Sequence, residues 1–149
     1  MEEKGRHVAE LLGQHRYQLD AKGRIALPAK FRDAFAEGVF VTLGEDGCIY
    51  AFPRQEWERR RDDARSRPLS GRVARDYARM FFGNADVLSL DKQGRLIVPQ
   101  KLRQQVGLTR DAVVVGVSDR LEIWSGEAWD RYEDSRVGAY VAGALEAPE

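Results

Sequence analysis

Two stretches of this chain carry the same order of apolar and polar positions. Each opens with a short alternating segment, at residues 17–19 and 88–90, followed by turn residues and a second apolar run. Longer apolar runs at residues 39–43 and 113–117 have the composition of buried strands, and a further apolar stretch follows each after a turn. The pattern predicts the order strand, strand, helix, strand, strand in both halves.

The turns after the first strands read "DAKG" and "DKQG". Asp20 and Asp91 supply side-chain acceptors for backbone N–H groups, and Gly23 and Gly94 can adopt the positive φ that a tight hairpin requires. These four residues are therefore predicted to have a structural role in the turns. The aspartates could in principle act as general bases, but the turn explains them without chemistry.

A short helix is predicted after each second strand. Pro28 and Pro99 suit the first position of a helix, where a missing N–H costs nothing. In the first copy Phe31, Ala34 and Phe35 then follow at the spacing of one helical face, and the second copy has the same spacing with one polar departure.

The segment between the copies predicts two helices, broken near Pro68 and Gly71, and a further helix is expected from Ser125 to about Val141. The arginines of this connecting segment could line a phosphate track or form an ordinary solvated face. Trp57, Trp124 and Trp129 are predicted to serve in packing.

The two halves are a sequence repeat. Residues 19–35 align without gaps to residues 90–106, at an offset of 71. One unit of about 40 residues is too small to bury a stable core, so both are expected to close into one structure. We expect a first unit at residues 12–53, connecting helices at 54–82, a second unit at 83–124, and a C-terminal helix and tail at 125–149.

Composition narrows the classes of protein. The single cysteine, Cys48, excludes an internal disulfide, and with only His7 and His15 as imidazoles no metal site is expected. No apolar run approaches the ~20 residues that a membrane span needs, which favours a cytoplasmic protein.

The net charge is zero, but residues 54–79 hold nine arginines against five acids, and residues 119–149 hold three arginines against eight acids. Such segregation can present a basic face on a neutral molecule.

The doubled motif "LDAKGRIALPAKFR" and "LDKQGRLIVPQKLR", with "MFFGNADVLSLDKQGR" leading into the second copy, resembles the MraZ family of bacterial transcription regulators, built from two SpoVT/AbrB-like units. The resemblance implies an α+β fold, a pseudo-twofold swapped-hairpin β-barrel from two ββαββ units, assembled into a ring of subunits. It further implies a nucleoid-associated repressor that binds double-stranded DNA at tandem promoter repeats of the division and cell wall gene cluster. No cofactor, small-molecule ligand or membrane partner is expected.

Arg24 and Arg95 are the main candidate DNA contacts. Each follows a turn glycine and lies four residues after an aspartate, so it could either pair with that aspartate or reach a phosphate or guanine edge. Because the arginine occurs in both copies of the motif, each time among other basic residues, a DNA contact is the favoured interpretation. The supporting candidates are Arg16, Lys22, Lys30, Arg32, Lys92, Lys101 and Arg103, of which the pairs Lys30/Lys101 and Arg32/Arg103 could instead be solvated helix positions.

The sequence bears on two other functions. A protein-binding module of antitoxin type is the alternative, because single-unit relatives of this kind neutralise toxins through a long tail, whereas here the tail is short. Catalysis is not expected, because the sequence has no nucleophile–base set, phosphate loop or metal-ligand cluster. Residues 1–11 and the acidic C-terminal part are left without a role.

Overall fold

The computed structural model describes residues 10–145 of the chain. The first half folds as predicted into strand, strand, short helix, strand and strand, with the bounds β1 (Leu11–Gln18), β2 (Arg24–Ala26), the 3₁₀ helix η2 (Ala29–Phe35), β3 (Val39–Leu43) and β4 (Ile49–Phe52). A single 3₁₀ turn, η3 (Glu45–Gly47), joins the last two strands.

The second half repeats this order, with the bounds β5 (Asp86–Leu88), β6 (Arg95–Ile97), α3 (Gln100–Val106), β7 (Asp111–Ser118) and β8 (Leu121–Ser125). The predicted order is thus confirmed in both halves. Both first strands begin earlier than the sequence pattern predicts, at Leu11 and Asp86 instead of residues 17 and 88. In β1 the reason is that Gly13 and exposed polar residues interrupt the apolar pattern.

Strands exchange partners between the halves. The six-stranded antiparallel sheet has the order β1-β7-β8-β4-β3-β5, so the first strand of each half pairs with the third strand of the other, and β4 pairs with β8 at the centre. This order is symmetric about the β8–β4 pair, as expected for a duplicated unit. The sheet is open at β1 and β5, so its hydrogen bonding does not close the expected barrel.

The remaining strands, β2 and β6, pair only with each other and form a two-stranded antiparallel ribbon. Ile25 lies opposite Leu96 at the centre of the ribbon. Leu27 N donates to the carbonyl oxygen of Gly94 at 3.1 Å, and Val98 N donates to that of Gly23 at 3.0 Å. One strand from each half is therefore needed to make the ribbon.

The main core lies between the ribbon, the short helices and the sheet. Equivalent residues of the two halves fill it, and the pairs Ile25 and Leu96, Leu27 and Val98, and Phe31 and Leu102 are all buried. Full burial of one such side chain contributes about 1.5–3 kcal/mol. The core is thus built from equivalent positions of the two repeats, as the turns are.

A second cluster, rich in aromatic residues, lies under the helices outside the repeats. Trp57 stacks on Phe81 with ring centroids 5.5 Å apart, and Trp124 meets Trp129 edge-on at 5.2 Å. These contacts fix α1 (Arg54–Arg65), α2 (Arg72–Gly83) and α4 (Gly126–Val141) to the sheet. The packing role predicted for the three tryptophans is confirmed.

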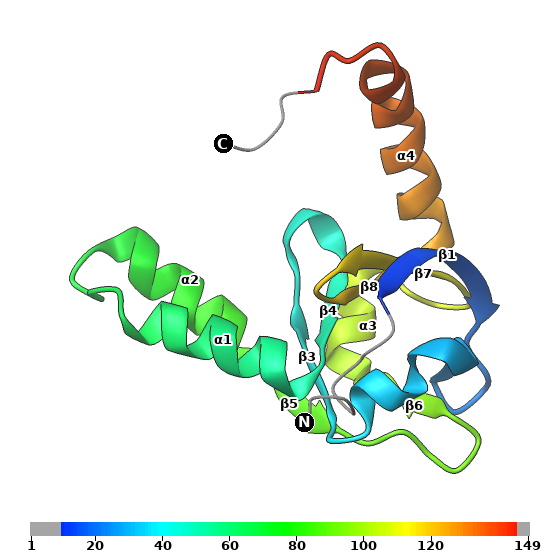
Figure 1. The fold of residues 1–149 in the computed structure, drawn as a ribbon, viewed down its shortest axis with the longest axis horizontal. Helices are drawn as coiled ribbons and strands as arrows, with labels where there is room; N and C mark the ends of the chain where they lie inside the picture. The colour runs from blue at the N-terminus through cyan, green and yellow to red at the C-terminus, as the bar shows by residue number, and fades with distance from the viewer. Residues whose placement is uncertain (1–9, 146–149) are drawn as a thin grey trace, which may run out of the picture.

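The helices point away from the body in two directions (Figure 1). The α1–α2 pair extends to one side, with its break at residues 66–71, where Pro68 and Gly71 predict it. Helix α4 begins where Ser125 Oγ accepts a hydrogen bond from Ala128 N at 3.1 Å, and its far end rises clear of the sheet.

Candidate nucleic-acid interface

The two turns beside the ribbon have the same geometry. Asp20 Oδ1 accepts from the backbone N–H groups of Lys22 and Arg24, both at 2.9 Å, and Asp20 Oδ2 accepts from Arg24 Nε at 2.6 Å. This is the hydrogen-bonding pattern of an Asx turn, extended by an ion pair. Gly23 completes the turn with a φ of 78°.

The second turn repeats these contacts. Asp91 Oδ1 accepts from Gln93 N at 2.9 Å and Arg95 N at 2.8 Å, and Asp91 Oδ2 accepts from Arg95 Nε at 2.8 Å. Gly94 has a φ of 77°. One sequence pattern therefore builds the same structure twice.

The turns stabilise the ionised form of both aspartates. The backbone N–H of Arg24 lowers the pKa of Asp20 most, and the Arg24 side chain and Lys22 backbone lower it further, to about 2. The pKa of Asp91 is also lowered, first by the backbone N–H of Arg95. Neither aspartate is suited to act as a general base near neutral pH.

Arg24 and Arg95 lie on the same face of the ribbon. Arg24 is opposite Ile97, and Arg95 is opposite Ala26. Ile25 and Leu96 between them are fully buried, so the arginines face outward together, as diagonal neighbours. Their side chains are 24% and 32% exposed.

Both readings of these arginines were open in the sequence, and the structure shows the aspartate pair. The pair uses Nε, so the Nη atoms form the outer end of each guanidinium. Arg95 Nη2 also donates to Gln93 Oε1. The aspartate fixes the direction of the side chain without occupying its whole donor set.

Arg32 and Arg103 differ from the other candidate arginines, because their guanidinium groups donate to backbone carbonyl oxygens and not to an acidic side chain. Arg32 donates from Nε and Nη2 to the carbonyl oxygen of Leu27, both at 3.3 Å, and Arg103 Nε donates to that of Val98 at 3.0 Å. Each guanidinium lies against the turn glycine of the other half. The structure gives both a structural role in joining the halves, which neither sequence reading anticipated.

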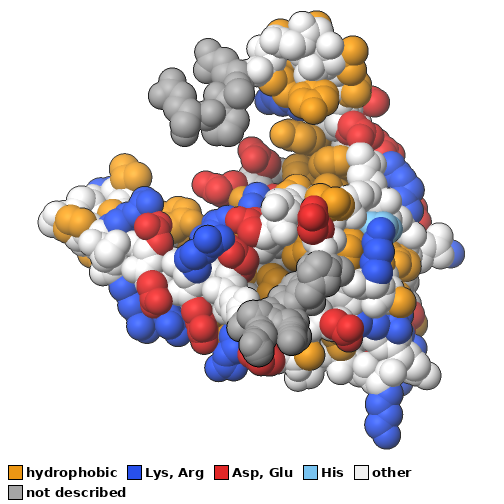
Figure 2. Space-filling model, viewed as in Figure 1, with side chains coloured by type: hydrophobic (Ala, Val, Ile, Leu, Met, Phe, Trp, Pro, Cys, Tyr) orange, Lys and Arg blue, Asp and Glu red, His pale blue; other side chains and the backbone are white. Residues whose placement is uncertain are grey.

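The remaining candidates are on the surface. Lys22 and Lys92 are exposed in the turns, and Lys101 is exposed on α3. Lys30 Nζ lies 5.3 Å from the centre of the Phe31 ring. Arg16 Nη2 pairs with Asp130 on α4 at 2.6 Å, so its guanidinium is directed to α4 and not to the ribbon. Figure 2 shows Lys and Arg side chains along the lower right margin, the side where Figure 1 places β6 and the turns.

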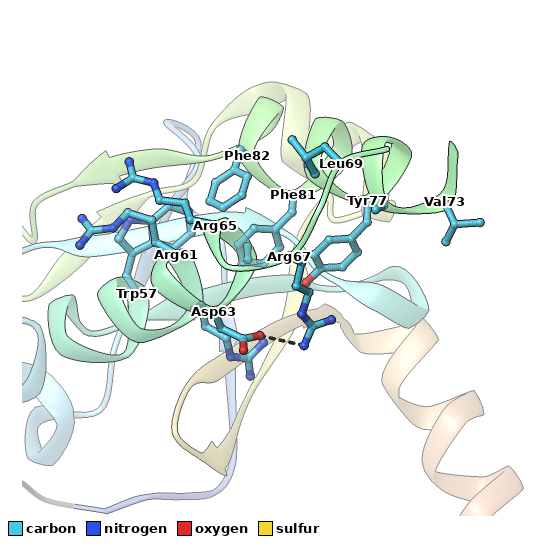
Figure 3. A pocket seen from close by; sticks show the side chains of 14 residues that line it. Trp57, Arg61, Asp63, Arg65, Arg67, Leu69, Val73, Tyr77, Phe81 and Phe82 are labelled. Carbon is cyan, nitrogen blue, oxygen red and sulfur yellow. Dashed lines mark hydrogen bonds and ion pairs between the residues drawn. The ribbon is translucent and has the colours of Figure 1, made fainter. Parts of the chain in front are cut away.

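Sequence reasoning missed a hollow between α1 and α2. Its volume is about 1120 Å³, and Trp57, Tyr77 and Phe81 form its apolar floor (Figure 3). Arginines of α1 and the following loop line its rim. No single residue signals such a hollow, because it arises from how two helices diverge.

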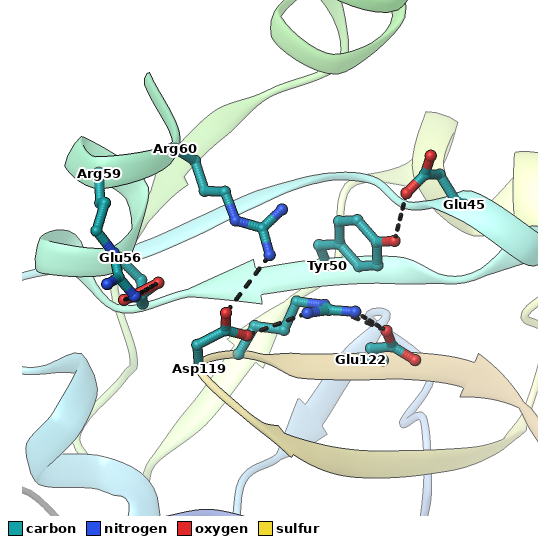
Figure 4. A network of polar contacts seen from close by, with 8 residues as sticks. Glu45, Tyr50, Glu56, Arg59, Arg60, Asp119 and Glu122 are labelled. Atoms are coloured by element: carbon teal, nitrogen blue, oxygen red, sulfur yellow. Dashed lines mark hydrogen bonds and ion pairs between the residues drawn. The ribbon is translucent and has the colours of Figure 1, made fainter. Parts of the chain in front are cut away.

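A polar network joins α1 to the sheet (Figure 4). Arg120 pairs with Glu122 at 2.7 Å and with Asp119 at 3.0 Å, and Asp119 also pairs with Arg60 of α1 at 3.5 Å. The Tyr50 ring lies beneath the Arg120 guanidinium. Burial raises the pKa of Tyr50 to about 12. Arg120, Asp119 and Glu122 have partners within the network, and the Tyr50 hydroxyl donates to Glu45 Oε1 at 3.1 Å, which marks the network as structural.

The described residues, 10–145, lack two other kinds of feature. Within this range no three residues of the His, Cys, Asp or Glu types are grouped so as to hold a metal ion. No helix there has the length and apolar character to span a membrane.

The chain matches the family model described as "MraZ protein, putative antitoxin-like" at residues 11–80 and again at 81–138. It belongs to the MraZ family. The resemblance found in the doubled motif is thereby confirmed, and the family model, like the repeat, matches twice along the chain.

MraZ relatives are similar over most of their length. The transcriptional regulator MraZ of Micrococcus luteus is 47% identical over 129 residues, which cover 87% of this chain and 90% of the relative. That of Paenarthrobacter aurescens is 45% identical over 129 residues, with the same coverage. That of Thermobifida fusca is 47% identical over 122 residues, covering 82% of this chain and 85% of the relative.

Proposed function

We propose that this chain is a DNA-binding transcriptional regulator that uses the β2–β6 ribbon as its reading surface. The observation that carries the proposal is the outward placement of Arg24 and Arg95 on one ribbon face, each oriented by an aspartate. The names of the MraZ relatives support a role in transcription. Catalysis has no part in the proposal.

The shape of the ribbon suits the major groove of B-DNA, which admits a two-stranded antiparallel ribbon. In that position the Nη atoms of Arg24 and Arg95 would reach a guanine edge or a phosphate. Lys22 and Lys92, exposed in the flanking turns, would contact the backbone on either side, with Lys30 and Lys101 further out. Arg32 and Arg103 would contribute by holding the turns in place.

We further propose a homo-oligomeric ring of such chains. Linked subunits would engage several tandem promoter repeats at once, so that moderate affinity per subunit suffices. In this proposal the chain is a nucleoid-associated repressor of the division and cell wall gene cluster. The ribbon and sheet would act together as one swapped-hairpin barrel, formed by the units at 12–53 and 83–124 and flanked by the segments 54–82 and 125–149.

The test is a fluorescence anisotropy titration on a labelled duplex taken from directly upstream of the protein's own gene. Arg24→Ala and Arg95→Ala should each weaken binding by roughly 5- to 150-fold, which corresponds to the ~1–3 kcal/mol of a good bidentate contact. Arg24→Lys should bind the duplex little better than Arg24→Ala, because lysine keeps the charge but lacks the planar fork of the guanidinium group.

Arg131→Ala is the matched control, because it also removes one arginine but lies on α4, where the side chain is 69% exposed. It should bind like the wild-type chain. If both ribbon variants stay folded and bind like this control, the ribbon is not the DNA-binding surface.

The antitoxin-type alternative is favoured only by the words of the family description. It predicts that the chain binds a protein partner while the duplex titration gives no binding that depends on Arg24 or Arg95. The same titration therefore separates the two functions.

A further inference from the structure

The β2–β6 ribbon carries an uncovered isoleucine on its outer face. Ile97 is 58% exposed, whereas its chain neighbours Leu96 and Val98 are buried. Of the large apolar side chains that are exposed within residues 10–145, Ile97 is the one that lies on the ribbon. A β-branched residue stabilises a strand mainly by packing against its neighbours. More than half of this side chain is left for a partner to cover.

Ile97 belongs to the same surface as the candidate DNA contacts. It lies directly opposite Arg24 in the ribbon, and the residues between the outward positions, Ile25 and Leu96, are fully buried. Alternate residues of a strand point to the same side. Four side chains therefore share the outer face, namely Arg24, Ala26, Arg95 and Ile97.

The two halves of the ribbon differ on this face. Ile97 is the equivalent of Ala26 at the repeat offset of 71, so Arg24 faces an isoleucine whereas Arg95 faces an alanine. Alanine ends at its β-carbon, and isoleucine extends three carbons further. The outer face is thus strongly apolar beside one arginine only, although the two turns have the same geometry.

An apolar side chain in the major groove has one matching group among the bases. Thymine presents its C5-methyl group there, whereas guanine presents the N7 and O6 acceptors that suit arginine. A polar base edge covered by isoleucine would lose water without gaining a hydrogen bond.

The spacing of the ribbon matches the spacing of the bases. Side chains directly opposite each other in an antiparallel pair have β-carbons about 4.5–5.5 Å apart. Successive bases of one strand rise by about 3.4 Å along the helix axis. The Ile97 side chain therefore falls one or two base pairs away from the base pair that Arg24 reaches.

We propose that Ile97 contacts the C5-methyl group of a thymine, one or two base pairs from the contact of Arg24. The inference rests on the proposed function, because it takes the outer face of the ribbon to lie in the major groove. Ala26 is too short to make the equivalent contact beside Arg95. The pseudo-twofold ribbon then reads a DNA site whose two halves differ at this position.

The test compares two forms of the labelled duplex taken from directly upstream of the protein's own gene. One contains thymine, and the other contains deoxyuridine at every thymine position, which removes the methyl group and keeps the base pairing. Fluorescence anisotropy gives the ratio of the two Kd values for each protein. The wild-type chain should bind the thymine duplex about fourfold more tightly per bound subunit, the effect of covering one methyl-sized group.

The substitutions are made at Ile97 and at a matched position. Ile97→Ala should bind both duplexes with nearly equal affinity, and Ile97→Val should keep part of the preference for thymine. Val87→Ala is the matched control, because Val87 is also 58% exposed but lies on β5 at the edge of the sheet. It should keep the wild-type ratio.

The ratio separates base recognition from a structural role of Ile97. Both affinities are measured with the same variant, so a general loss of folded protein cancels. A wild-type chain that binds the two duplexes equally would overturn the proposal. An Ile97→Ala variant that keeps the wild-type preference for thymine would overturn it as well.

Failure of the DNA function would look different. Arg24→Ala and Arg95→Ala would then bind like Arg131→Ala, and the Ile97 contact would fall together with the ribbon. If the ribbon arginine variants lose affinity while the wild-type chain does not distinguish thymine from deoxyuridine, the ribbon is the DNA-binding surface and the Ile97 contact is wrong.

Discussion

The guanidinium carbon of Arg103 lies 2.8 Å from the place where a β-carbon on Gly23 would stand, and Arg32 occupies the equivalent place at Gly94. The arginine of each half thus covers the turn of the other. The contact requires glycine for two reasons, the space above it and the positive φ of the turn.

Gly23→Ala and Gly94→Ala are therefore expected to destabilise the chain. The left-handed backbone alone costs about 1–2 kcal/mol with a β-carbon, and displacing the arginine adds to this. The loss should be larger for Gly94, where Arg32 Nε lies only 2.1 Å from the added atom's position. The free energy of unfolding, measured by urea denaturation, checks this.

Gly83→Ala is the matched control, because Gly83 lies in α2 and an added β-carbon there meets nothing within 4 Å. It should leave stability unchanged or raise it by up to about 0.5–1 kcal/mol. Equal losses at all three glycines would show that the arginine contacts are unimportant.

Arg32→Ala and Arg103→Ala should also lower stability. Each leaves a carbonyl oxygen, of Leu27 or Val98, without its side-chain donor, and an unsatisfied buried acceptor costs about 1–3 kcal/mol. Thermal or urea unfolding measures the loss. Arg79→Ala, on an exposed side chain of α2, should change stability by less than about 0.5 kcal/mol. A folded, fully stable Arg103→Ala protein would contradict the structural role.

The two turns could be predicted from the sequence, because an aspartate, a glycine and their spacing define an Asx turn locally. The strands at residues 39–43 and 113–117 were equally clear from their apolar runs. The position of Arg32 over Gly94 could not be predicted, because the partners are 62 residues apart and no local pattern states which half covers which. The open sheet could not be predicted either, because its strand order depends on pairings between the two halves.

The titration of Asp20 offers a direct check of the first turn. Its folded pKa of about 2 lies below the ordinary value of 3.8, so its contribution to stability is present above about pH 4 and is lost as the pH falls toward 2. Carboxyl NMR on the labelled protein should give this low value. Asp20→Asn serves to assign the signal by removing it, and a value near 3.8 in the wild-type chain would mean that the turn hydrogen bonds are absent in solution.

The exposed lysines of the turns should control the salt dependence of DNA binding. If Lys22 and Lys92 each contact one phosphate, replacing either by alanine should reduce the slope of log K against log salt by about 0.9 per subunit bound. The loss should be similar for different DNA sequences, since phosphate contacts carry no sequence information. Titrations at several salt concentrations measure the slope, and Arg131→Ala should leave it at the wild-type value. An unaltered slope in both lysine variants would place the phosphate contacts elsewhere.

The pairing of β1 with β7 sets the timing of folding on the ribosome. Leu11 pairs with Ser118, so on the ribosome β1 has no partner strand until about 100 further residues have been synthesised. Because β1 with β7, β2 with β6 and β3 with β5 all pair across the halves, we expect the nascent chain to complete its structure in one late step.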